Sequence, residues 1–142
     1  MLHAMKKTIG LLLTIFPIFC VAEDNFLHMM VQGNYLLVGK ALNSDATYHG
    51  KVQIKDNDGS LTVLRSINGQ IITGTAAIES AAGGDVKVLR IRFTEDKTDY
   101  EETCMVGSDL DNYARISCYL YQPKISTRQP GLEVLFIDHT VK

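Results

Sequence analysis

The stretch Tyr48-His49-Gly50-Lys51-Val52-Gln53-Ile54-Lys55 decides the fold of this 142-residue chain. Tyrosine, glycine, valine and isoleucine occupy every second position, and polar or basic residues lie between them. Successive side chains of a strand point to opposite faces of a sheet, so this alternation predicts a strand with one face in a core and the other in water.

The same alternation recurs between Tyr35 and Ile137 in short segments that Gly, Asn and Asp turns separate. The Asn68-Gly69 pair is a strong hairpin signal, because both central residues of a type I′ turn need positive φ. Tight turns of this kind pair consecutive strands in antiparallel order. The expected strands cover residues 33–40, 47–55, 60–67, 70–79, 86–93, 98–107, 112–121 and 131–137.

About eight sequential strands predict an all-β protein with a single antiparallel up-and-down β-barrel, because a closed sheet has no unpaired edge. The same hairpins would also fit a two-sheet sandwich, and the alternation does not separate these two architectures. An eight-stranded barrel is just wide enough for side chains or for one small ligand.

The first 22 residues have the pattern of a secretory signal peptide. Lys6 and Lys7 precede an apolar stretch, and the small residues Cys20 and Ala22 precede an acidic pair. The stretch is shorter than the roughly 20 apolar residues of a membrane span, and Pro17 interrupts it. We therefore expect a signal peptide over 1–22, a single barrel domain over 23–142, a periplasmic or secreted location, and no membrane span after cleavage.

The charge and the cysteine content limit which partners and which cellular compartment are expected. Cleavage would remove two of the 14 basic residues and none of the 16 acidic ones, which leaves 12 minus 16, or −4. This charge, spread without long runs, predicts no nucleic-acid surface. Cys104 and Cys118 would be the two remaining cysteines, at matched places on consecutive predicted strands. We expect them to form a disulfide worth about 3 kcal/mol on the chain-entropy model.

Several glycines and aromatic residues follow a spacing that is also found in a known type of protein. They are Gly33-x-Tyr35, Gly39, Tyr48-x-Gly50-x-Val52-x-Ile54, Gly59, Asn68-Gly69, Gly74 and Gly131-x-Glu133. With the leader and the domain size, they resemble small secreted bacterial β-barrels of unassigned function with the calycin-like architecture of lipocalins and avidins. Tyr35 stands where lipocalins usually have tryptophan, and the chain has no tryptophan for an avidin-type biotin pocket. The resemblance implies an architecture and a binding role.

No motif predicts a metal, a cofactor or a catalytic residue. Asp56-Asn57-Asp58-Gly59 resembles part of a calcium loop, but Ile54 and Arg65 occupy the positions where acidic ligands are needed. The sequence also has no Gly-x-Ser-x-Gly elbow. Glu101 and Glu102 are neighbours on a predicted strand, so they point to opposite faces and do not form an acid/base pair. The remaining histidines lack the spacing of a zinc site: His28, His49 and His139.

Tyrosines and arginines are the candidate ligand-binding residues, because they combine apolar contact with a group that orients a ligand. They are Tyr35, Tyr48, Arg65, Tyr113, Arg115 and Tyr119. We expect an exported, non-enzymatic barrel that binds a small apolar or amphipathic ligand without a cofactor. The alternative is a protein-protein interaction module with a filled barrel, such as an inhibitor or a cell-envelope or host-contact protein. It would use the polar-aromatic face of residues 112–121 and the loop 122–130.

Overall fold

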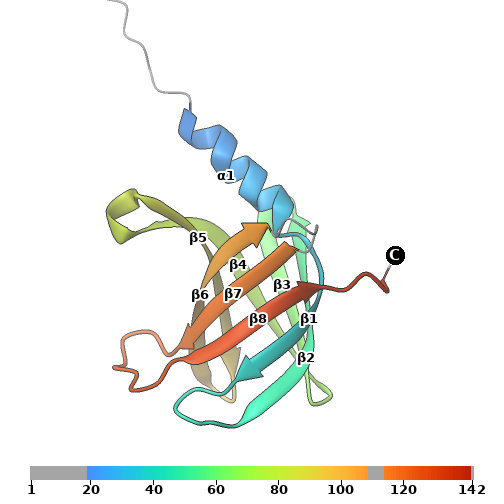
Figure 1. Ribbon diagram of the computed structural model, residues 1–142, viewed down its shortest axis with the longest axis vertical. Helices are drawn as coiled ribbons and strands as arrows, with labels where there is room; N and C mark the ends of the chain where they lie inside the picture. The colour runs from blue at the N-terminus through green and yellow to red at the C-terminus, as the bar shows by residue number, and fades with distance from the viewer. Residues whose placement is uncertain (1–18, 109–113, 142) are drawn as a thin grey trace, which may run out of the picture.

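The computed structural model describes residues 19–108 and 114–141, and its eight strands close into one antiparallel barrel in the order β1 to β8 (Figure 1). The up-and-down barrel prediction is confirmed, and the sandwich alternative is wrong. The strands are β1 (Gly33–Lys40), β2 (Thr47–Asn57), β3 (Ser60–Ile67), β4 (Gln70–Ala81), β5 (Val86–Glu95), β6 (Thr98–Ser108), β7 (Ala114–Tyr121) and β8 (Gly131–Ile137).

The barrel closes because β1 pairs with two neighbours, β2 on one side and β8 on the other. Tyr35 lies opposite Val52 of β2 and opposite Ile137 of β8. Every strand therefore has hydrogen-bonding partners on both sides, which removes the exposed edges that would pair with other chains. The predicted strand bounds agree with the observed ones to within two residues.

The alternation in the sequence matches the two faces of the barrel wall, with mostly apolar positions inside and mostly polar positions outside. Val52 and Ile54 are buried, whereas Lys51, which precedes Val52, is exposed. The same period fills the interior from all strands. The largest buried apolar side chains are Tyr35, Leu37, Ile54, Leu61, Leu89, Ile91, Ile116 and Leu135.

The predicted turns have the backbone conformation that their residues favour. Asn68 and Gly69 have φ values of 53° and 79°, as a type I′ hairpin needs. The Asp56 carboxylate accepts a hydrogen bond of 2.8 Å from the backbone N–H of Gly59. This local bond confirms that Asp56-Asn57-Asp58-Gly59 is a turn between β2 and β3.

The two ends of the barrel differ. Helix α1 (Phe19–Met30) lies at one end, and the hairpin connections β1–β2, β3–β4, β5–β6 and β7–β8 lie at the other (Figure 1). Val31, which follows the helix, belongs to the core, and its carbonyl accepts a 2.8 Å hydrogen bond from the Tyr35 hydroxyl. The Asp24 carboxylate adds an ion pair of 3.0 Å with Lys87 Nζ. In the described part of the chain, no helix has the length and apolar character needed to cross a membrane.

Candidate functional site

A cavity of about 300 Å³ opens at the hairpin end of the barrel, opposite helix α1. It lies inside the rim, where the last inward-facing residues of several strands meet the connection that follows β1. Its walls combine aromatic and aliphatic side chains with a few polar groups. The described residues that line it are Ala41, Leu42, Tyr48, Arg65, Ile67, Asn68, Phe93, Glu95, Tyr100 and Leu120.

A buried ion-pair network forms the floor of this cavity. Arg65 of β3 donates two hydrogen bonds to Glu133 of β8, at 2.9 Å from Nη1 and 2.6 Å from Nη2. Its Nη1 also donates to Oε1 of Glu102 on β6, at 2.5 Å. The Tyr48 hydroxyl donates to Oε1 of Glu133. These bonds cross the barrel and fix four strands relative to one another, and all three charged side chains are at most 2% exposed.

The pKa values of the two carboxyl groups shift in opposite directions. Burial raises the pKa of Glu102 well above its ordinary range, and the Glu133 charge adds to this effect against the attraction of Arg65. Burial would also raise the pKa of Glu133, but the hydrogen bonds from Arg65 and Tyr48 outweigh it and lower that pKa. Burial thus favours the protonated form of Glu102, whereas the ionised form of Glu133 is favoured beside the Arg65 guanidinium.

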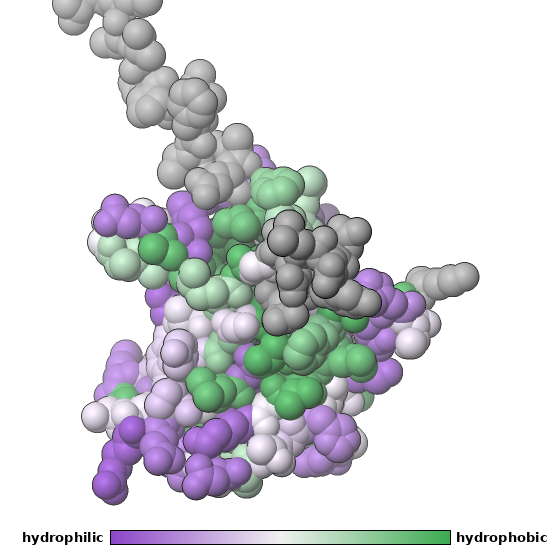
Figure 2. Space-filling view, viewed as in Figure 1, coloured by the Kyte–Doolittle hydropathy of each residue, from purple (hydrophilic) through white to green (hydrophobic). Residues whose placement is uncertain are grey.

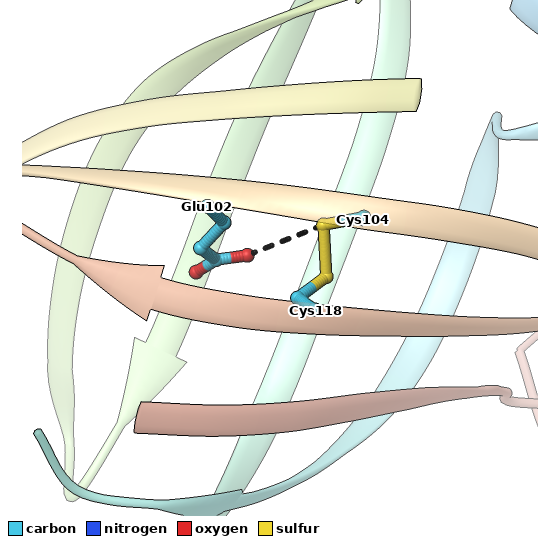
Figure 3. Close-up of side chains that lie close together, drawn as sticks. All are labelled: Glu102, Cys104 and Cys118. Atoms are coloured by element: carbon cyan, nitrogen blue, oxygen red, sulfur yellow. Dashed lines mark hydrogen bonds between the residues drawn. A yellow bond between two sulfur atoms is a disulfide. The ribbon is translucent and has the colours of Figure 1, made fainter. Parts of the chain in front are cut away.

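A disulfide lies beside Glu102 (Figure 3). Cys104 and Cys118 lie opposite each other on β6 and β7 and are bonded, as the sequence predicted. Oε2 of Glu102 lies 3.9 Å from Sγ of Cys104. A disulfide sulfur carries no hydrogen, so a hydrogen bond here requires the proton on Glu102. For the same reason this group of residues, although close enough to surround a metal ion, offers no thiolate ligand.

The raised pKa of Glu102 predicts how stability varies with pH. A group that is protonated in the fold but ionises near pH 4.5 when unfolded stabilises the fold fully below that pH. This stabilisation is lost as pH rises toward the folded pKa. Glutamine does not ionise, so we expect the stability of Glu102→Gln relative to wild type to increase from pH 5 to pH 7 in urea unfolding, by at most about 1.4 kcal/mol per pH unit.

Glu101→Gln is the matched control for this prediction. Glu101 lies on the outer face and accepts hydrogen bonds from Tyr121 and Arg92, which lower its pKa although burial opposes them. Its contribution is present above the unfolded pKa and is lost as pH falls, so this variant should lose stability relative to wild type as pH rises. A constant difference between wild type and Glu102→Gln from pH 5 to 7 would contradict a protonated Glu102.

An aromatic stack connects the network to the cavity wall. Cζ of Arg65 lies 4.2 Å from the centroid of the Phe93 ring, a cation–π distance. The Phe93 ring in turn stacks on Tyr100, with centroids 5.4 Å apart and an interplanar angle of 21°. Gly39 makes room for the remaining aromatic wall, because a Cβ at this position would lie 2.4 Å from Cζ of Tyr48.

Two of the six predicted ligand-binding residues, Tyr48 and Arg65, line the cavity. Tyr35 is buried at the α1 end, where burial raises its pKa to about 12. Tyr119 is on the outer surface and is 58% exposed. Tyr113 lies outside the described residues. Arg115 is placed in β7 opposite Gly107 of β6, and its side chain is outside the description.

Most of the cavity lining and both carboxylates of the network, Glu102 and Glu133, were absent from the predicted ligand-binding residues. The alternation contained part of the signal, because it placed Glu102 on the face opposite Glu101. The missing information was which inward residues meet across the barrel. Arg65 and Glu133 are 68 positions apart, and only the closed strand order brings them together.

The outer surface has two unlike regions. Over β4 to β6, Arg92 bridges Glu79 and Glu101 with bonds of 2.6 and 2.7 Å. Apolar residues gather instead over the face of β1 and β8 that Figure 2 shows. This outer apolar face continues onto β7 and β6, since Tyr119 lies opposite both Leu132 and Thr103. Its exposed members are Leu36, Val38, Met105, Tyr119 and Leu132.

Comparisons of the chain with protein-family models, with curated proteins and with solved structures gave no match. The likeness to calycins therefore rests on the all-strand, eight-stranded antiparallel barrel, which is consistent with that architecture. The Cys104–Cys118 disulfide fits an oxidising compartment.

Proposed function

We propose that this protein is an exported, non-enzymatic binding protein that holds a small amphipathic molecule in the mouth of its barrel. The cavity carries this proposal, because its volume of about 300 Å³ is at the lower end of the range for small-molecule pockets. Phe93, Tyr100 and Leu120 offer apolar contact, and Asn68 and Glu95 at the rim offer polar groups. A ligand with an apolar body and one polar end matches this division.

The floor of the cavity supports binding rather than catalysis. A general acid or base must reach the proton that it transfers. Glu102 and Glu133 are fully buried and do not line the cavity, because Arg65 lies between them and the mouth. Tyr48 does line the cavity, but its hydroxyl already donates a hydrogen bond to Glu133. These carboxyl groups have the bonding pattern of a structural plug.

Export is supported by the leader-like first 22 residues together with the Cys104–Cys118 disulfide. Disulfides persist in the periplasm and outside the cell and are rare in the cytosol. The bond is also fully internal, because both cysteines are buried in the barrel.

An interaction module that used the outer apolar face would be the weaker candidate, because this face is small. The outer apolar face spans four strands about 4.8 Å apart and about three residues along each, or roughly 200 Å². A typical monomer exposes a largest apolar patch of about 300–600 Å², and a stable interface needs about 800 Å² from each partner. The face is therefore within the range of an ordinary monomer surface.

Binding of N-phenyl-1-naphthylamine, a neutral dye that brightens in apolar sites, tests the proposal. The chain has no tryptophan, so dye fluorescence is read without interference from the protein. We expect saturable binding with one site per chain. Ala41→Phe fills the mouth from a residue outside the buried core, so it should weaken dye binding by about tenfold or more.

Val38→Thr is the control, because it removes an apolar group from the outer apolar face and leaves the mouth unchanged. It should bind the dye as the wild type does. Dye binding that Val38→Thr reduces and Ala41→Phe does not would place the site outside the barrel and reject the proposal. Native mass spectrometry of the exported protein adds an independent readout: a co-purified small molecule supports the proposal, and a discrete dimer favours the interaction module.

A further inference from the structure

We infer that the mouth cavity prefers an organic cation, a molecule with an apolar body and an ammonium-type end, over the corresponding anion. This inference rests on the proposed binding function and names the chemical class of its ligand. It follows from the direction in which each charged group around the cavity points. Two of the described residues that line the cavity are charged, Arg65 and Glu95.

Arg65 offers no exposed donor to an anionic ligand. Its Nη1 and Nη2 atoms donate to Glu102 and Glu133, and its Nε atom, which has no hydrogen-bond partner among the described residues, is buried out of reach of the mouth. The whole side chain is 2% exposed. A carboxylate or sulfonate entering the mouth would therefore lose its water without gaining the paired hydrogen bonds that arginine usually provides. The positive charge of Arg65 is also balanced within the network by Glu133.

Glu95 has the opposite arrangement. It is the next inward position after Phe93 on β5, and its side chain is partly exposed at the cavity rim. Among the described side chains, those of residues 24–107 and 116–141, none forms a hydrogen bond or ion pair with its carboxylate. By contrast, the Asp45 carboxylate at the same end of the barrel lies 3.5 Å from Lys40 Nζ. Glu95 is thus an available partner for a positive charge at the mouth.

The aromatic walls add to this preference. A cation is attracted to the face of a tyrosine or phenylalanine ring, and the effect increases where water is excluded. One ring of the wall already holds a cation in this way, since the Arg65 guanidinium lies over Phe93. Tyr48 and Tyr100 line the same cavity and provide further ring surface. An aromatic wall beside an unpaired carboxylate is the arrangement that suits an alkylammonium group.

Three probes with the same apolar body test the inference: 3-phenylpropyltrimethylammonium, 3-phenylpropanol and 3-phenylpropanesulfonate. Their binding to the full chain is measured by titration, following the amide resonances of Asn68 and Glu95 at the mouth. We expect the cation to bind at least tenfold more tightly than the anion, with the alcohol between them. Added salt should reduce the affinity for the cation and leave that for the alcohol unchanged.

Glu95→Gln should reduce the affinity for the cation about fivefold to tenfold and leave the affinity for the alcohol unchanged. Asp96→Asn is the matched control, because it removes the same charge from the next residue, which is exposed and does not line the cavity. Equal or tighter binding of the anion, or equal effects of the two substitutions, would overturn the inference while dye and alcohol binding still supported the mouth as a binding site. Failure of the dye and all three probes to bind would reject the proposed function itself.

Discussion

Replacing Arg65 with methionine is expected to lower the free energy of unfolding at pH 7 by about 3–5 kcal/mol, the cost of removing one partner from a buried ion pair. Glu133 would lose both hydrogen bonds from the guanidinium and remain buried. Methionine keeps most of the side-chain volume, so the loss reports the unpaired charge more than a cavity. Most domains are stable by about 5–15 kcal/mol, and the effect is therefore a large part of the total. Urea unfolding measures it.

The pH dependence of this variant identifies the cause. Without Arg65, burial is opposed only by the hydrogen bonds that Tyr48 and Glu102 make with Glu133, and we expect the folded pKa of Glu133 to rise above the unfolded value. The protonated form then fits the fold, so the destabilisation should be largest at neutral pH and should shrink as pH falls toward 4.5. Adding Glu133→Gln to Arg65→Met removes the stranded charge and should restore at least about 2 kcal/mol at pH 7. A loss below about 1 kcal/mol in the single variant, or no recovery in the double variant, would contradict a Glu133 that is ionised and paired.

The sequence predicted the wall of the barrel better than its interior. Alternation acts within one strand, so it predicts which face each residue takes, and this placed Val52 and Ile54 in the core and Lys51 in solvent. It also placed Arg65 on the inward face with Leu61 and Val63. Turn chemistry predicted strand order, because Asn68-Gly69 allows little besides a tight hairpin.

Contacts across the barrel needed information that alternation does not contain. Two inward residues meet only if they also lie at the same height along the barrel axis, and this height depends on the register of every strand between them. Tyr35 and Tyr48 both came from the sequence as candidate pocket residues, yet Tyr35 lies at the α1 end and Tyr48 at the mouth. Glu133 was seen as part of a glycine-spaced pattern, and its pairing with Arg65 appeared only in the closed structure.

The disulfide was predictable because it is a local contact. Cys104 and Cys118 belong to consecutive strands and are separated by 14 positions, so the hairpin alone brings them into register. Because the two cysteines are close in sequence, the bond closes only a short loop of the unfolded chain. It does not connect strands that are distant in sequence. Its contribution is therefore expected to come mainly from the unfolded state.

Replacing both Cys104 and Cys118 with alanine is expected to lower the free energy of unfolding by about 3 kcal/mol, the loop-closure value for a cross-link of this length. Alanine suits these positions because both are buried in the apolar core, where serine would bury unpaired hydroxyl groups. The denaturant dependence of unfolding should also become steeper, since the unfolded chain without the cross-link exposes more surface. Wild-type protein unfolded in the presence of reductant is the matched control and should approach the same midpoint.

A double variant within about 1 kcal/mol of oxidised wild type, or two thiols open to alkylation in unreduced, denatured wild type, would contradict the disulfide between Cys104 and Cys118. Because the Glu102 carboxyl lies against Cys104, the double variant should in addition shift the pH at which Glu102 ionises, which a pH series on the double variant with and without Glu102→Gln would detect.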